Sequence, residues 1–197
     1  MSDTGPIRDP RTDEQLMVAF ARGSSDAFHV LFLRYRQPLF GFFCRRLADR
    51  ARAEELTQDA FIAVLRAQGR YEATALFRTY LYAVAFGILR ADRRKAAFRG
   101  LFTGRADYEP SAPAGIEPGL ALREAISKLD KIDREIVLLR EFEELSYAEI
   151  AEVLHIPVNT VRSRLFRARA ALRGLLTAPA PRANPITHVE TSAEEHV

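Results

Sequence analysis

The 197-residue sequence is poor in the features that define secreted and membrane proteins. Its single cysteine, Cys44, cannot form an intramolecular disulfide, and this favours a cytoplasmic protein. Because Cys44 follows two phenylalanines, we interpret it as a small core residue rather than a nucleophile. No stretch approaches the run of about 20 apolar residues that spans a bilayer. The polar N-terminus also lacks the charged-then-apolar order of a signal peptide.

Motifs for catalysis and cofactor binding are missing as well. The sequence contains no Gly-rich phosphate loop, no Cys/His set with zinc spacing, and no nucleophile with an accompanying base. The four histidines are scattered at His29, His155, His188 and His196. We therefore predict that the chain is not an enzyme and needs neither a cofactor nor a metal.

The formal net charge is only +3, but the basic residues are unevenly distributed. They cluster within residues 90–105 and again within residues 162–173. Two separate clusters of one sign predict two contacts with a polyanion.

Residues 146–173 show the pattern of a helix-turn-helix. Ser146 and Glu149 form a capping box that begins a first helix, and Pro157 marks the break before a second. Small Ala151 allows the two helices to cross closely, and Val161 fits beneath the crossing. The apolar residues that recur at helical spacing are Ile150, Ala151 and Leu154 in the first helix, and Val158, Val161, Leu165, Ala168 and Leu172 in the second.

The second of these helices carries arginines but no acidic residue between positions 158 and 176. Arg and Asn can contact base edges in a bidentate manner, and an exposed aromatic can meet a thymine methyl group. The alternative is a basic, solvated amphipathic helix without a ligand. The outward face consists of Asn159, Arg162, Ser163, Phe166 and Arg167.

Apolar residues at helical spacing elsewhere predict an all-α fold of two small domains joined by a flexible linker. In the first domain we expect helices at about 12–22, 25–47, 52–66 and 76–96, with Pro38 kinking or dividing the second. In the second domain we expect two helices, at about 120–128 and 131–141, before the helix-turn-helix. Proline, glycine and small polar residues predict the linker. The predicted map is a flexible tail at 1–11, a domain at 12–97, a linker at 98–119, a domain at 120–176 and a disordered tail at 177–197.

Two surfaces of the first domain attract attention. The third helix carries an acidic and amide patch of Glu54, Glu55, Gln58 and Asp59. Judged by helical periodicity alone, this patch is an ordinary solvated face with acids near a helix N-terminus. The fourth helix combines aromatics with a basic end, which suits the stacking of unpaired bases and the binding of their phosphates. Most of those aromatics are equally expected in a core, whereas Tyr71 and Tyr80 are better candidates for exposure.

The segment LREAISKLDKIDREIVLLREFEELSYAEIAEVLHIPVNTVRSRLFRARAALR resembles the C-terminal domain of extracytoplasmic-function (ECF) sigma factors. YRQPLFGFFCRRLADRARAEELTQDAFIAVLRAQGRY, followed by FRTYLYAVAFGILRADRRKAA, is similar to their N-terminal domain. The resemblance implies a sigma factor that binds core RNA polymerase and directs promoter-specific transcription, with an anti-sigma factor as a possible partner.

The resemblance also implies roles for particular residues. Glu54, Glu55, Leu56, Gln58, Asp59 and Phe61 match the helix that binds the clamp helices of the largest polymerase subunit. Arg70, Tyr71, Thr74, Tyr80, Arg90, Arg93 and Arg94 match the part that opens and reads the −10 element, with a pocket for a flipped base. Asn159, Thr160, Arg162, Ser163, Arg164, Phe166 and Arg167 match the helix that enters the −35 major groove.

The sequence departs from the family pattern at several positions. Gly87 and Ala91 stand where the family usually carries Asn and Asp, with Asp92 one place late, and Tyr80 stands where tryptophan is common. The resemblance therefore implies a role at the −10 element without specifying the preferred bases. His155 replaces a frequent turn glycine, so it is expected to adopt a left-handed conformation.

Two non-enzymatic functions compete with a sigma factor. A stand-alone helix-turn-helix regulator would share the C-terminal domain but would bind duplex DNA tightly by itself. The aromatic and basic fourth helix argues against this alternative, because a repressor does not hold unpaired bases. A helical module that binds an acidic protein is the other alternative.

Overall fold

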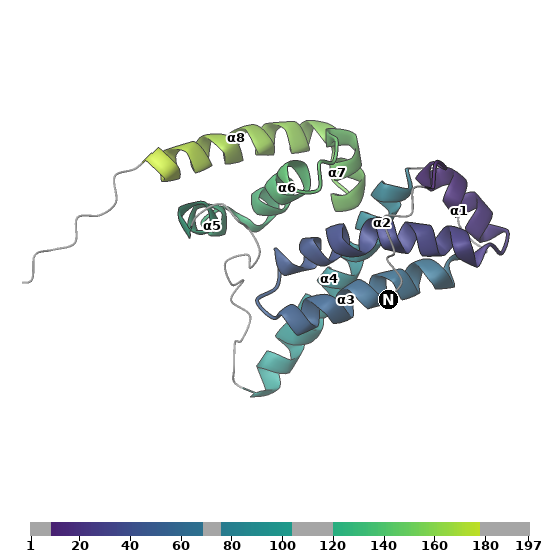
Figure 1. The fold of residues 1–197 in the computed structure, drawn as a ribbon. Helices are drawn as coiled ribbons and strands as arrows, with labels where there is room; N and C mark the ends of the chain where they lie inside the picture. Colours follow the sequence, from purple (N-terminus) through teal and green to yellow (C-terminus); the bar gives the residue numbers. More distant parts are fainter. Residues whose placement is uncertain (1–8, 69–75, 104–119, 178–197) are drawn as a thin grey trace, which may run out of the picture.

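The computed structural model describes residues 9–68, 76–103 and 120–177, and these residues form helices without any strand (Figure 1). The all-α prediction is therefore confirmed. Four helices come from the N-terminal half and four from the C-terminal half. They are α1 (Asp13–Ala21), α2 (Ser25–Cys44), α3 (Arg50–Arg66), α4 (Phe77–Thr103), α5 (Leu120–Ser127), α6 (Lys131–Glu141), α7 (Tyr147–Leu154) and α8 (Val158–Thr177).

Local capping explains why several helices begin where they do. The Thr12 hydroxyl accepts from the Gln15 amide at 3.2 Å, and the Gln15 side chain accepts from the Thr12 amide, which makes a complete capping box. The Asp49 carboxylate caps α3 in the same way, by accepting from the Ala51 amide at 2.9 Å. Between α1 and α2, Gly23 adopts φ 102°, a conformation that glycine adopts without a steric penalty.

Two predicted boundaries differ from the structure. Pro38 is predicted to kink or divide the second helix; α2 is continuous from Ser25 to Cys44 with Pro38 inside it, so Pro38 does not divide the helix. α4 continues through Thr103, beyond the predicted domain end at residue 97. Favourable helix formers at the boundary, Ala96, Ala97 and Arg99, carry that helix into the segment that composition assigned to the linker.

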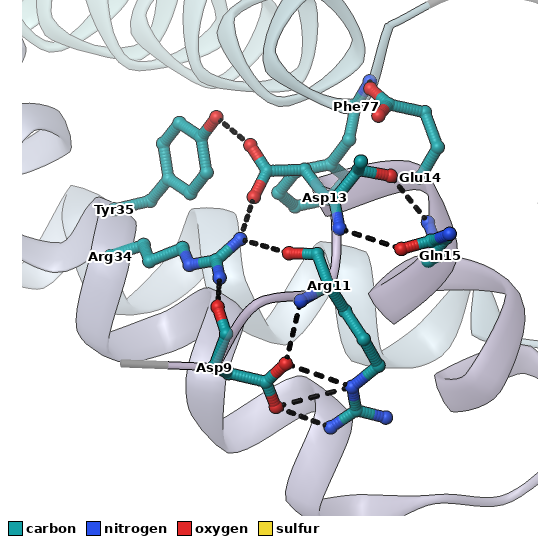
Figure 2. Close-up of polar contacts among 9 residues, drawn as sticks. Asp9, Arg11, Asp13, Glu14, Gln15, Arg34, Tyr35 and Phe77 are labelled. Carbon is teal, nitrogen blue, oxygen red and sulfur yellow. Dashed lines mark hydrogen bonds and ion pairs between the residues drawn. The ribbon is translucent and has the colours of Figure 1, made fainter. Parts of the chain in front are cut away.

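Residues 9–11 are held against α2 rather than forming part of a loose tail (Figure 2). Arg34 donates to the backbone carbonyls of Asp9 and Arg11, at 2.6 and 3.0 Å, and to the Asp13 carboxylate at 2.6 Å. The Tyr35 hydroxyl donates to the same Asp13 carboxylate. The tail prediction is therefore wrong for residues 9–11, because α2 supplies donors that fix them, and residues 1–8 lie outside the described part of the chain.

The two helical halves pack directly on each other through α4 and α7, and α6–α8 lie above α2 in the view of Figure 1. Arg46, which is 4% exposed, pairs across this contact with Glu135 at 2.7 Å and with Glu143 at 2.9 Å. α4 contacts α1, α2 and α3 in its own half and α7 in the other. One hydrophobic core runs from Leu16 in α1 to Ala168 in α8. Burying a large apolar side chain contributes about 1.5–3 kcal/mol, so this shared core favours the packed arrangement.

Candidate nucleic-acid interface

The turn between α7 and α8 is built by local backbone chemistry. Ser146 and Glu149 form the predicted capping box, in which the Ser146 amide donates to the Glu149 carboxylate at 2.8 Å. His155 adopts φ 54° and ψ 49°, which confirms the expected left-handed conformation. The Ile156 amide then donates to the Ala151 carbonyl at 3.0 Å and closes the end of α7. α8 begins directly after Pro157, whose carbonyl accepts from the Thr160 amide at 2.9 Å.

One face of α8 is buried and the opposite face is open. Val161, Leu165 and Ala168 are at most 1% exposed and anchor α8 on the core. Phe166, by contrast, is 76% exposed, although burial of an aromatic ring is favourable. The open face forms a shallow hollow of about 660 Å³ lined by Asn159, Arg162, Ser163, Phe166 and Arg167.

The arginines of this face are not engaged elsewhere in the protein. Within the described part of the chain, neither Arg162 nor Arg167 has a hydrogen-bond or ion-pair partner. The structure thus brings together five of the seven residues that the sequence assigned to duplex reading. The guanidinium groups of Arg162 and Arg167 can therefore approach a polyanion without first breaking an internal ion pair.

The other two assigned residues lie away from that face. Arg164 donates to the Asp133 carboxylate of α6 at 2.8 Å, so it joins α8 to the core rather than facing outward. Thr160 is half-buried and lines no part of the hollow. The sequence assigned both residues by their place in the motif, which does not reveal which side of α8 is covered by α6.

α4 presents only part of its predicted basic surface. Arg90 and Arg94 are exposed, whereas Arg93 is half-buried and donates to Glu135 of α6 at 3.0 Å. Tyr80 is half-buried, and its ring lies 6.5 Å from that of Phe77. Arg70, Tyr71 and Thr74 lie outside the described residues.

The positions that depart from the family pattern also have clear places in α4. Gly87 is exposed, with open space where a Cβ would stand, and Ala91 is half-buried. Asp92 is 7% exposed and accepts from Arg52 of α3 at 2.6 Å. Asp92 therefore ties α3 to α4 instead of facing a ligand. The start of α4 is fixed by Glu14, whose carboxylate accepts from the Phe77 amide at 3.3 Å (Figure 2).

The acidic and amide patch of α3 borders a groove between α2 and α3. Glu54, Glu55, Gln58 and Asp59 are exposed, whereas Leu56 is 1% exposed and belongs to the core. Leu56 therefore supports the helix from inside and offers no surface to a partner. The groove has a volume of about 340 Å³ and is lined by Phe32, Arg36, Gln37, Phe40, Arg50, Glu54, Thr57, Gln58 and Phe61.

Sequence reasoning missed the α2 side of this groove. Phe40 and Arg50 form a cation–π contact, with the guanidinium carbon 4.8 Å from the ring centre. Phe61, which is only 4% exposed, lies at the bottom of the groove. Arg36 and Gln37 are adjacent exposed residues of α2, and two consecutive polar residues in a largely apolar helix were the available signal.

The described residues offer neither a metal site nor a membrane-spanning helix. Within the described ranges, no cluster of His, Cys, Asp and Glu could hold a metal ion. No helix in those ranges is long and apolar enough to cross a membrane. Burial raises the pKa of the Cys44 thiol, which is half-buried against the core. An all-α fold with an open arginine and aromatic face on a helix-turn-helix defines a DNA-binding protein.

Comparison with known proteins matches both halves of the chain. Residues 31–99 match Sigma-70 region 2, and residues 119–172 match Sigma-70, region 4. The RNA polymerase sigma-H factor of Pseudomonas aeruginosa is 34% identical over 176 residues, covering 81% of this chain and 91% of that protein. RNA polymerase sigma factor CarQ of Myxococcus xanthus is 33% identical over 165 residues, covering 81% and 95%. The ECF RNA polymerase sigma-E factor of Escherichia coli K12 is 29% identical over 180 residues, covering 82% and 92%.

Two solved structures resemble the fold of this chain. CnrH in complex with the cytosolic domain of CnrY is 25% identical, with a TM-score of 0.61 over 83% of this chain and 96% of CnrH. RpoE in complex with the anti-sigma factor NepR, from Bartonella quintana, has the same fold. Its TM-score is 0.63 at 23% identity, over 76% of this chain and 96% of RpoE.

The chain belongs to the ECF sigma factors of the sigma-70 family. It is an alternative sigma factor that directs promoter-specific transcription initiation by RNA polymerase. The family consists of transcription initiation factors rather than known enzymes.

Proposed function

We propose that the open face of α8 reads the −35 element in the major groove of duplex DNA. The observation that carries this assignment is the hollow formed by Asn159, Arg162, Ser163, Phe166 and Arg167, whose two arginines have no partner in the described residues. Arg side chains at this spacing can contact guanine bidentately, and the exposed phenylalanine suits a thymine methyl group.

We assign the −10 element to the N-terminal half. Arg90 and Arg94 of α4 are exposed and would hold phosphates of the melted strand. Tyr80 lies near the start of the same helix. Arg70, Tyr71 and Thr74, which precede α4, complete the proposed contact.

The groove between α2 and α3 is the proposed docking site for core polymerase. Its lining combines Glu54 and Gln58 of the acidic and amide patch with Arg36 and Arg50. The half-buried rings of Phe32 and Phe40 supply apolar surface. A hydrophobic centre with a charged rim is the usual plan of a specific protein interface. The acids give charge selectivity for a basic helical partner.

The proposal also includes a division into domains, a cellular location and a regulatory partner. It divides the function between residues 12–97 and 120–176, with 98–119 as the connection. Transcription initiation takes place on the chromosome, so the proposed location is the cytoplasm. Because RpoE of Bartonella quintana was solved with an anti-sigma factor, we include a regulator of that kind among the proposed partners.

The −35 assignment is tested with holoenzyme assembled from this chain and core polymerase. Arg162→Ala and Arg167→Ala should each weaken binding to the preferred promoter by ~1–3 kcal/mol if the arginine makes a bidentate base contact. Arg169→Ala is the matched control, because Arg169 lies on the same helix but pairs with Glu141 at 2.7 Å. Competition binding over a promoter library measures the preference.

The result distinguishes recognition of specific bases from general electrostatic attraction to DNA. Loss of preference in the first two variants, with the control unchanged, supports direct reading by α8. Equal promoter preference in all four proteins would overturn the assignment.

The docking assignment is tested by Asp59→Lys, with Glu124→Lys as the control. Both carboxylates are exposed, so neither change removes a buried contact. Asp59→Lys should reduce core-polymerase pull-down and run-off transcription, since it places a cation against a basic partner. Glu124→Lys has the same charge change on α5 and should leave both unchanged. Normal transcription from a folded Asp59→Lys variant, verified by circular dichroism, would refute docking at this groove.

A further inference from the structure

The first turn of α4 takes a cap from another helix. Leu76, the residue before α4, has an aliphatic side chain that cannot accept a hydrogen bond, and the first four residues, FRTY, include no acid. The first backbone N–H groups of a helix have no intrahelical partner, so they need an acceptor from elsewhere. The Glu14 carboxylate of α1 supplies one, since it accepts from the Phe77 amide at 3.3 Å.

Glu14 is held in place because its neighbour Asp13 is fixed on α2 (Figure 2). Arg34 donates to the Asp13 carboxylate at 2.6 Å, and the Tyr35 hydroxyl donates to the same carboxylate. The Tyr35 ring then meets the Phe77 ring edge to face, with the ring centres 5.4 Å apart. Contacts from α1 and α2 therefore converge on Phe77, which is fully buried.

The residue that follows α3 is attached to the same helix α1. The Gln68 side-chain amide donates to the Phe20 carbonyl at 2.8 Å. Glu14 and Phe20 are six residues apart in α1, so they are separated by about 9 Å along the helix axis. A single rigid helix thus holds Gln68 at one end of residues 69–75 and Phe77 just beyond the other.

The two attachments matter because of what lies between and after them in the proposed function. The −10 contact is assigned there to Arg70, Tyr71 and Thr74, and to Tyr80, whose ring lies 6.5 Å from that of Phe77. Taking a base out of the stack costs a few kcal/mol, which contacts to the flipped base must supply. Fixing the two ends of a binding segment reduces the conformational freedom it loses on capture, so more of the contact energy is left for opening.

We propose that Glu14 and Gln68 are positioning residues for promoter opening. Helix α1 is a rigid spacer that sets the separation between the end of α3 and the start of α4. The two side chains do not contact DNA; they act through Phe77 and through the attachment of the segment that precedes it. The inference rests on the proposed function in taking the residues around the start of α4 as the −10 contact.

The test uses holoenzyme assembled from the full chain and core polymerase, with Glu14→Ala and Gln68→Met as the two anchor variants. Methionine keeps the length of the glutamine side chain but has no N–H donor. Glu14→Gln retains a carbonyl oxygen for the Phe77 amide and is the conservative variant. Ser24→Ala is the matched control, because it removes a cap of similar strength from α2, where the Ser24 hydroxyl accepts from the Ala27 amide at 3.3 Å.

A fluorescent adenine analogue in the −10 element separates the opening step from initial promoter binding. Each anchor variant should open the promoter about 5-fold more slowly, the factor that corresponds to a hydrogen bond or cap of about 1 kcal/mol. Core affinity and initial promoter binding should stay at the wild-type values, and Glu14→Gln and Ser24→Ala should open at the wild-type rate. In the free chain, a nitroxide at Leu76→Cys, a position that is 53% exposed, should move faster in both anchor variants than in Ser24→Ala, all in a Cys44→Ser background.

Circular dichroism verifies that each variant is folded, and if Glu14→Ala is not, Gln68→Met decides the matter. Equal slowing in Ser24→Ala would reduce the effect to lost stability and overturn the inference. A wild-type opening rate or an unchanged nitroxide spectrum in the folded anchor variants would also overturn it.

An Arg90→Ala/Arg94→Ala variant keeps the proposed function separate from the positioning role. Slow opening in this variant, with wild-type opening in the anchor variants, would refute positioning by α1 and leave the −10 assignment standing. Slow opening in the anchor variants alone would support positioning and refute the phosphate contacts proposed for α4.

Discussion

Replacement of Arg46 by methionine tests the energetics of the contact between the halves. Methionine keeps an unbranched apolar stem of similar length, so the change removes the guanidinium without leaving a large cavity. Removing one partner of a buried ion pair costs roughly 3–5 kcal/mol, because the remaining charge is left uncompensated. Here Glu135 retains Arg93 and Glu143 retains Arg45, at 3.0 and 2.5 Å. We therefore expect the lower end of the range, about 3 kcal/mol.

Urea unfolding followed by circular dichroism measures this loss. Thermal unfolding gives a second readout: for a chain of this size 1 kcal/mol corresponds to roughly 2–4 °C in Tm, so Tm should fall by about 6–12 °C. Arg36→Met is the control, since Arg36 is exposed on α2, which ends just before Arg46, and its replacement should change stability by about 0.5 kcal/mol or less. A loss below about 1 kcal/mol for Arg46→Met would refute the reasoning, because it would show that the buried charge is compensated without Arg46.

Two further predictions concern the turn between α7 and α8 and the loss of stability at low pH. His155→Gly should raise the free energy of unfolding by about 0.5–1 kcal/mol, because relief of the left-handed strain exceeds the added chain entropy of glycine; unchanged or lower stability in urea would contradict this. Burial by itself raises the pKa of Glu135, but Arg46 and Arg93 outweigh it, and the pKa lies below its ordinary value of 4.5. A lowered carboxyl pKa contributes stability above the unfolded pKa that is lost as pH falls through the folded one. Stability should therefore decline below about pH 4.5, with a shallower slope in Glu135→Gln, and identical slopes would contradict the assignment.

The local features of this protein follow from short stretches of its sequence. The capping pair Ser146 and Glu149, the turn at Pro157 and the apolar stripe of α8 are encoded within a few residues of one another. Short-range hydrogen bonds and helical periodicity are sufficient to specify them. The open face with Arg162 and Phe166 followed, because the side of α8 opposite a buried stripe must face outward. Resemblance to a known family then gave the function, which the comparisons confirmed.

Which charged and apolar residues are buried depends, by contrast, on how the helices pack together. Arg164 and Arg167 are alike in sequence, yet Arg164 pairs with Asp133 and Arg167 remains open. Arg46 meets Glu135 and Glu143 across 89 and 97 residues of chain, so no local pattern links them. A pairing of that kind depends on how whole helices pack, and it is stable only after the shared core has excluded water from both partners.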